Sequence, residues 1–312
     1  MSRQRFPNTN LGSQRRGPSS PSRVCRRPLP ARDSAILLAL DQYRYLDREQ
    51  VTELFFRGRR QAQLRLEQLA TRGLIHCWAR NRSPSVYALT TSGARHVARL
   101  RAEDPRPIIE RARRSREQTY HLRHDLEANG VFVKLAAGGR HLADQGLYHW
   151  LGENACRAAR EREGSPPSDG WGRYLLADRE ITFDLEWDRG TEHAGRIRQK
   201  ASGYVAYFRG RRDAERHQVL FVAPTGAREG ELNELIESVM PRHVALCRFW
   251  TTTVDHYAEH GLLAAVWLEI GGTGDRVAFG SLPGLPRSAR ATGDCIAKPF
   301  WWERRPGGGE GA

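Results

Sequence analysis

Residues 181–188 read Ile-Thr-Phe-Asp-Leu-Glu-Trp-Asp, so large apolar side chains alternate with polar ones. This period of two predicts a β-strand with two unlike faces. The apolar face is formed by Ile181, Phe183, Leu185 and Trp187, and the acidic face by Asp184, Glu186 and Asp188. The apolar face needs a core to pack on. Clustered carboxylates destabilise one another unless a cation lies among them, which argues against the simpler interpretation of a solvated acidic face.

A lysine on the next predicted element supplies such a cation. Lysines are rare in this arginine-rich chain, occurring only at positions 134, 200 and 298. Lys200 shares one side of a predicted helix over 193–209 with Ile197 and Tyr204, so it is expected to face the sheet. Asp169 precedes the neighbouring predicted strand, and we therefore expect Asp169, Glu186 and Lys200 to converge at a sheet edge.

This trio is the set of groups that a metal-dependent phosphodiesterase needs. Carboxylate oxygens hold Mg²⁺, the ion polarises a phosphate and activates water, and a lysine neutralises developing charge. The pattern predicts Asp169 and Glu186 as metal ligands and Asp188 and Lys200 as further catalytic candidates. Glu127 on an upstream helix is an additional acid, or equally a surface residue.

The elements expected after residue 106 alternate between helix and strand, which predicts an α/β domain with a mixed sheet. The apolar segment 218–223 reads as a central strand. Helices are predicted over 119–137, 193–209 and 229–239, and strands over 145–151, 172–177, 181–187, 218–223, 244–250 and 263–270. From Gly271 onward, Gly and Pro dominate, and we interpret 271–312 as a tail.

The preceding segment, 33–106, predicts a different unit. Apolar periodicity, an N-cap at Asp47 and a stop at Gly73 indicate three helices, the third over about 58–72. Strands over 74–78 and 86–89 and a further helix follow. This is the order of a winged helix, a DNA-binding variant of the helix-turn-helix.

Polar side chains on the third helix form one stripe, suited to base edges and phosphates. Further arginines lie at its start, where helix N-termini favour phosphate, and at the tip of the predicted wing. The full set of DNA-binding candidates is Arg57, Arg59, Arg60, Gln61, Arg65, Gln68, Arg72, Arg80 and Arg82. The alternatives are an ordinary solvated helix face and a winged helix that binds protein.

Charge and composition favour the nucleic-acid interpretation. The formal net charge is +14, which favours polyanionic partners, with DNA first. Residues 1–32 contain eight arginines and no acidic residue, and predict a disordered basic arm that either binds phosphate or is inert. No apolar run is long enough for a membrane span, and the scattered cysteines indicate neither a metal cluster nor disulfides, so we expect a cytoplasmic protein.

One cluster of histidines also has metal-ligand spacing. His121, His124 and Asp125 lie at i, i+3 and i+4 on a predicted helix. No third element supplies an obvious further ligand, so the interpretation we favour here is structural hydrogen bonding.

The segment Leu185–Glu192, followed by Lys200 and Tyr204, resembles the Glu-hydrophobic-Asp-Arg-Gly-Thr motif of the replication-relaxation protein family. The resemblance extends over about residues 33–250 and also involves His124-Asp125-Leu126, Asn129, Trp150 and Glu153. It implies a winged helix followed by a domain similar to the PD-(D/E)xK restriction-endonuclease fold. It also implies a plasmid or integrative element as the setting.

Under this resemblance, Asp169 is the Asp of the Pro-Asp motif and Glu186 is the acid of the (Asp/Glu)-x-Lys motif. The chain departs from the pattern twice: Ser168 interrupts the Pro-Asp pair, and Asp188 occupies the lysine position, so Lys200 would serve from the next helix. We therefore expect a DNA-binding protein of replication or relaxation that nicks DNA with Mg²⁺. The alternative is a non-enzymatic replication initiator or transcriptional regulator.

Overall fold

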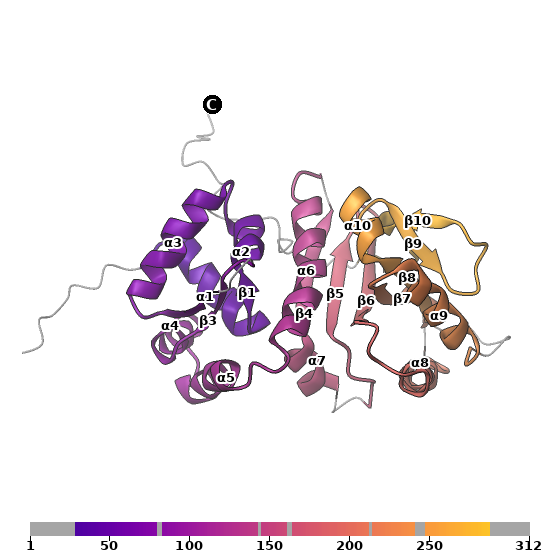
Figure 1. Cartoon of the computed structure of the whole chain (residues 1–312), viewed down its shortest axis with the longest axis horizontal. Coiled ribbons are helices and arrows are strands. Elements are labelled where there is room, and N and C mark those ends of the chain that lie inside the picture. The colour runs from indigo at the N-terminus through magenta and orange to yellow at the C-terminus, as the bar shows by residue number, and fades with distance from the viewer. Residues whose placement is uncertain are drawn as a thin grey trace, which may run out of the picture.

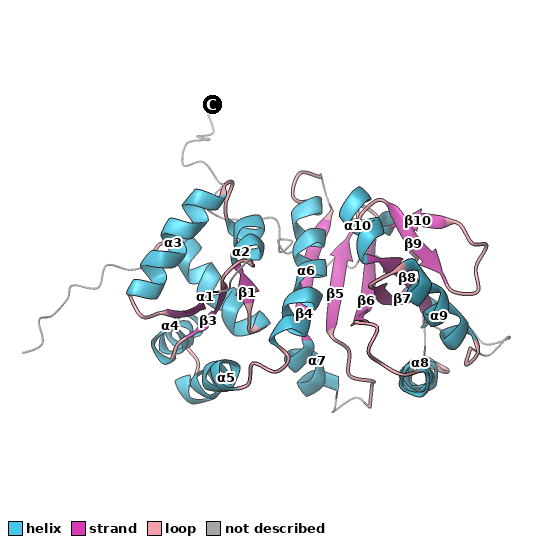
Figure 2. Ribbon diagram, in the orientation of Figure 1, coloured by secondary structure: helices cyan, strands magenta, loops and turns pink. Residues whose placement is uncertain are grey.

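A computed structural model describes residues 29–79, 83–142, 145–160, 164–211, 214–240 and 247–287 (Figure 1). Within these residues the chain is an α/β protein with ten α-helices and a large mixed sheet, as the sequence predicted (Figure 2). The first elements lie at one end of the molecule and the large sheet at the other, with the long helix α6 between them (Figure 1). None of the described helices is long and apolar enough to cross a bilayer. The predicted arm, residues 1–32, lies almost entirely outside the described residues.

The N-terminal part contains three helices followed by a small antiparallel sheet of order β1-β3-β2 and a fourth helix. These elements are α1 (Ala31–Tyr43), β1 (Leu46–Asp47), α2 (Arg48–Phe55), α3 (Arg59–Thr71), β2 (Ile75–Trp78), β3 (Val86–Leu89) and α4 (Thr91–Arg101). The predicted start of α2 is confirmed, since Asp47 and Gln50 form a capping box there. Gly73 has a φ of 66° just after α3, the left-handed conformation that a helix C′ glycine supplies.

Helix α5 (Pro105–Glu117) begins at a proline, which is well tolerated in a first helical turn. Its Ile108 and Ala112 are buried. Helix α5 contacts α4 extensively, and the hydroxyl of Tyr45 donates a hydrogen bond to the carbonyl of Ser115. The connection between the two parts of the chain is therefore packed onto the N-terminal elements.

The large sheet has the strand order β10-β9-β8-β7-β6-β5-β4, and β11 also pairs with β6. Strands β4, β5 and β6 are antiparallel neighbours, whereas β6, β7 and β8 run parallel. The elements in chain order are α6 (Leu122–Gly139), β4 (Gly146–Gly152), α7 (Glu153–Arg160), β5 (Gly170–Leu175), β6 (Arg179–Trp187), α8 (Ala194–Phe208), β7 (His217–Ala223), α9 (Gly226–Glu237), β8 (Arg248–Thr253), α10 (Val254–His260), β9 (Ala265–Glu269), β10 (Arg276–Ala278) and β11 (Leu285–Pro286).

Helices cover both faces of this sheet. The apolar face of β6 packs in one core with α6, and the opposite face of the sheet packs against α8 and α9. Strand β5 approaches α6 closely: a Cβ on Gly172 would lie 2.4 Å from the ring of Phe183 and 3.0 Å from that of Phe132. This tight packing places the first turns of α6 beside the start of β5.

Several elements differ from the sequence prediction. Strand β8 lies later than the expected 244–250, and β1 and α7 were not predicted. Residues 276–286, assigned to the Gly/Pro-rich tail, contain two short strands that return to the sheet. Strand β10 pairs with the preceding strand β9, whereas β11 pairs with β6, about a hundred residues earlier in the chain, which local composition does not reveal. The rest of the assigned tail, from residue 288, lies outside the described residues.

Candidate active site

The structure brings Asp169 and Glu186 to one edge of the large sheet. Strand β5 begins where β6 ends, because Gly170 pairs with Leu185 in the antiparallel register. The backbone N–H of Asp169 donates to the carbonyl of Leu185 at 3.0 Å. The Oδ2 of Asp169 accepts a hydrogen bond from the backbone N–H of Trp187 at 2.8 Å. The carboxylate of Asp169 therefore contacts the backbone of the residue that follows Glu186.

Two side chains of α8 hold Glu186. The Nζ of Lys200 lies 2.9 Å from Glu186 Oε2, and the hydroxyl of Tyr204 donates to Oε1 at 2.6 Å. Lys200 also lies 3.3 Å from Glu192, in the loop that leads into the helix. Lys200 therefore occupies the sheet-facing position that its spacing indicated.

The charges of this cluster follow from burial and proximity. Glu186 is only 1% exposed, and burial raises its pKa to about 7, against the lowering effects of Lys200 and Tyr204. Burial acts to lower the pKa of Lys200, but the carboxylates of Glu186 and Asp169 raise it well above its ordinary value. Burial also acts to raise the pKa of Asp169, yet hydrogen bonding to His124 and the charge of Lys200 hold it below the usual range. Near neutral pH, Asp169 is thus an anion and Lys200 a cation, and burial makes Glu186 easier to protonate than an ordinary glutamate.

His124, for which the sequence analysis favoured structural hydrogen bonding, is a further member of this site, and its contact with Asp169 was not predicted. Its Nε2 lies 3.3 Å from Asp169 Oδ2. Burial acts to lower the pKa of His124, but Asp169 outweighs that effect and raises it to about 9. The adjacent His124-Asp125 pair on α6 was the available signal. The sequence alone did not show that α6 passes the start of β5.

Asp188 lies apart from the cluster. Its Oδ2 is 2.5 Å from the Nε of Arg228 on α9, and its Oδ1 accepts from the N–H of Gly190 at 3.0 Å. Asp188 is therefore an anchor between the end of β6 and α9. Glu127 is also separate, since it accepts from the indole of Trp187 at 3.0 Å and pairs with Arg123 and Arg189.

The donor set at the sheet edge suits a hard divalent cation. Asp169 and Glu186 supply carboxylate oxygens, the ligands that Mg²⁺ prefers. Lys200 now neutralises Glu186, and His124 neutralises Asp169. An ion at this position would share the carboxylates with these two basic groups.

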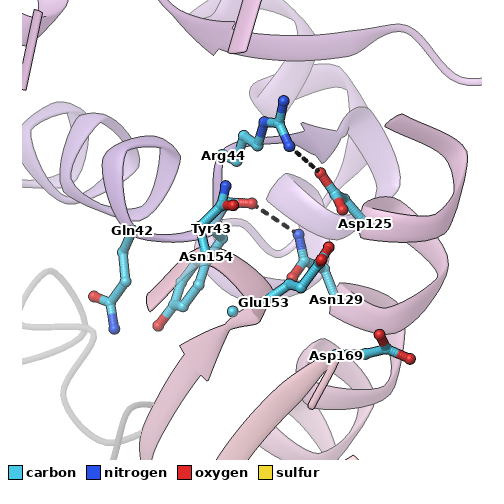
Figure 3. A pocket seen from close by; sticks show the side chains of 9 residues that line it. Gln42, Tyr43, Arg44, Asp125, Asn129, Glu153, Asn154 and Asp169 are labelled. Carbon is cyan, nitrogen blue, oxygen red and sulfur yellow. Dashed lines mark hydrogen bonds and ion pairs between the residues drawn. The ribbon is translucent and has the colours of Figure 1, made fainter. Parts of the chain in front are cut away.

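A cavity of about 20 Å³ opens beside Asp169, at the junction of the N-terminal elements and the sheet (Figure 3). It is lined by Gln42, Tyr43, Arg44, Asp125, Asn129, Gly152, Glu153, Asn154 and Asp169. The amide of Asn129 donates to the carbonyls of Tyr43 and Tyr45 at 3.0 and 2.9 Å. The ring of Trp150 stacks on that of Tyr43 with centroids 3.5 Å apart. The motif residues Asn129, Trp150 and Glu153 therefore gather where the two parts of the chain meet.

Helix α3 lies at the outer end of the N-terminal part (Figure 1). Six of the predicted DNA-binding residues at its start and along its outer face are exposed: Arg57, Arg59, Arg60, Gln61, Gln68 and Arg72. Arg59 pairs with Glu49 at 2.7 Å. Arg65 is different, because its Nε and Nη2 each lie 2.6 Å from an oxygen of the buried Asp33. Arg80 and Arg82 lie outside the described residues.

A comparison with protein families shows that a family model described as Replication-relaxation matches residues 37–222. The match spans the N-terminal elements, the cavity, and the sheet edge with Asp169, Glu186 and Lys200. No curated protein and no solved structure matches the chain.

Proposed function

Because the chain belongs to the replication-relaxation family, we propose that it is a cytoplasmic DNA-binding protein of plasmid or mobile-element replication that nicks DNA with Mg²⁺. The observation that carries the catalytic part of this proposal is the convergence of Asp169, Glu186 and Lys200 at one edge of the sheet. The N-terminal elements would bind DNA and the sheet domain would act on a strand.

Three features support a winged-helix domain over about residues 33–106. Three helices followed by a β2–β3 hairpin, with the short strand β1 as the third strand of the small sheet, are typical of this class of DNA-binding domain. Helix α3 would be the recognition helix, and Glu67 is the single acidic residue in its sequence. The excess of arginine in the chain provides attraction to phosphate.

The topology of the second part supports a PD-(D/E)xK-like domain, which was predicted over residues 107–270 and extends further, to the strands β10 and β11 of the same sheet. Helix α6 precedes three antiparallel strands, and α8 then crosses over to the parallel strand β7. This order places an acid at the start of β5 and another at the end of β6, which is what the family resemblance implies for Asp169 and Glu186. Lys200 supplies the positive charge from α8 in place of residue 188.

The roles of the side chains follow from their contacts. Asp169 and Glu186 would hold Mg²⁺, and Tyr204 fixes the orientation of Glu186. The bound ion would polarise the phosphate and favour ionisation of a water molecule. Lys200 would place its positive charge beside the phosphate oxygens, where negative charge grows in the transition state.

Conversion of a supercoiled plasmid carrying the cognate origin to open circles tests this function. Wild-type protein is expected to nick with Mg²⁺ and not with EDTA. Asp169→Asn and Glu186→Gln are expected to abolish nicking and to spare DNA binding, because an amide lacks the negative charge that holds a hard cation. Glu259→Gln, at an exposed position on α10, serves as the control.

A second function, a non-enzymatic replication initiator or regulator, is favoured by one observation. Both carboxylates already have basic partners, Lys200 for Glu186 and His124 for Asp169. The charges of the cluster are therefore balanced without a metal ion, as in a purely structural ion-pair network. The same assay separates the two functions. Site-specific DNA binding without Mg²⁺-dependent nicking by the wild-type protein would leave only the binding function.

A further inference from the structure

A second group of potential metal ligands adjoins the proposed active site and shares one residue, His124, with it. His124 and Asp125 are neighbours on α6, and Glu153 is the first residue of α7. One ligand atom from each of the three lies within 4.8 Å of the others. This separation suits three side chains that bind one ion between them, and the third ligand comes from an element that was not predicted.

Asp125 is the least satisfied member of this group. Its side chain is only 8% exposed, and its Oδ2 pairs with Arg44 at 3.2 Å. Its other oxygen, Oδ1, is buried and has no hydrogen-bond partner among the described residues. A buried carboxylate oxygen without a partner is costly unless a cation or a donor reaches it.

The surroundings of Asp125 point to a cation. The carboxylates of Asp125 and Glu153 lie close together, and Arg44 pairs with only one oxygen of Asp125. Arg157 pairs with Oε1 of Glu153. Asp125, Glu153 and Asp169 all line the cavity in Figure 3. Carboxylates gathered around a small cavity repel one another, and a bound cation removes that repulsion.

We propose that His124, Asp125 and Glu153 bind a divalent transition-metal ion at this cavity, and that this ion is Mn²⁺. One imidazole and two carboxylates combine nitrogen and oxygen ligands, a set that suits Mn²⁺ better than Mg²⁺. Asp169 contacts His124 and would orient its ring, as carboxylates commonly do for metal-bound histidines. The ion would lie beside the Arg44–Asp125 pair, where the N-terminal part meets α6.

Electron paramagnetic resonance of Mn²⁺ tests this site on the full-length protein after removal of metals with EDTA. We expect wild-type protein to bind Mn²⁺ and the bound ion to show coupling to an imidazole nitrogen. His124→Gln is expected to remove that coupling. Asp125→Asn and Glu153→Gln are each expected to weaken binding at least about ten-fold, whereas Glu259→Gln leaves it unchanged. The coupling in the wild-type protein needs no variant, so the test stands even if one variant fails to fold.

Glu186→Gln separates this site from the proposed catalytic one. The ion at the cavity is expected to keep its nitrogen coupling in this variant, even though nicking is lost. Wild-type protein without nitrogen-coupled Mn²⁺ would overturn the inference. So would Mn²⁺ binding that disappears in Glu186→Gln and persists in Glu153→Gln. Neither result would refute the proposed nicking function, which rests on the plasmid assay.

Discussion

Lys200 reaches Glu186 from a helix: its Nζ, on α8, lies 2.9 Å from the Oε2 of a carboxylate on β6. Asp188 stands where the family resemblance would place the lysine of an (Asp/Glu)-x-Lys motif, and it binds Arg228. The positive charge at this sheet edge therefore comes from a different element, and the two positions have separate roles that mutation can distinguish.

Replacing Lys200 tests its role in chemistry. Lys200→Ala is expected to lower the nicking rate by about 10²-fold or more with a much smaller change in DNA affinity, because the charge would act on the transition state. It should also raise the pKa of Glu186 further, since Lys200 lowers that pKa in the wild-type protein. Single-turnover nicking and a binding titration measure the two effects. Lys134→Ala, which removes an exposed lysine paired with Glu53, is the matched control. Equal losses of rate and affinity would contradict the assignment.

Asp188 is expected to matter for folding. Asp188 and Arg228 are 2% and 10% exposed, and removing one partner of a buried ion pair typically costs about 3–5 kcal/mol. Asp188→Asn should therefore lower the free energy of unfolding substantially. Asp188→Lys should lower it more, because it places two cations together. Denaturant unfolding gives the values. Glu231→Gln removes the half-exposed second partner of the same arginine and should cost less than about 1 kcal/mol. Similar losses in Asp188→Asn and Glu231→Gln would refute the anchoring role.

Strand β6 and helix α8 show what the sequence could predict. The alternation in 181–188 and the spacing of Lys200 with Ile197 and Tyr204 are local periodicities, and both indicate the correct faces. The α/β class and most helix bounds follow from the same kind of signal. Asp169 was expected near Glu186 because it precedes a neighbouring strand, and the β5–β6 register places it there.

The contacts that the sequence did not reveal join distant segments. The pairing of His124 with Asp169 and that of Asp188 with Arg228 depend on how α6 and α9 pack on the sheet. The bidentate contact between Arg65 and Asp33 depends on the approach of α3 to α1. Helical periodicity placed Arg65 on the polar stripe correctly, but it carries no information about a partner on another helix.

The His124–Asp169 pair predicts a specific dependence of stability on pH. The pKa of His124 rises from an ordinary 6.5 to about 9 in the folded protein, so the folded state binds the proton more tightly than the unfolded one. Its contribution, roughly 2–3 kcal/mol, is present in full below pH 6.5 and is lost as the pH rises towards 9. Urea unfolding with EDTA, compared between wild type and His124→Gln, measures it. The difference between the two proteins should shrink from pH 6 to pH 9.5, and a constant difference would contradict the prediction.

Arg65 and Arg72 lie on the same helix but should respond differently to truncation. The guanidinium of Arg65 makes two 2.6 Å contacts with Asp33, which is only 1% exposed, so Arg65→Ala leaves a buried carboxylate without its partner. We expect a loss of about 3–5 kcal/mol in the free energy of unfolding. The sequence alone suggested base contact by Arg65 instead, with a loss of about 1–3 kcal/mol in specific binding.

Arg72 is exposed just after the last turn of α3 and forms no ion pair with the residues that the structure describes. If it contacts a phosphate, Arg72→Ala should leave stability unchanged, weaken binding to all DNA sequences alike, and reduce the slope of log affinity against log salt by about 0.9. Fluorescence anisotropy at several salt concentrations, beside thermal unfolding of both variants, separates the two residues. A different outcome would contradict the structural role of Arg65: an Arg65→Ala protein of unchanged stability that has an altered base preference in footprinting on randomised DNA. DNA would then displace the contact with Asp33, and Arg65 would contact a base, as the sequence analysis predicted.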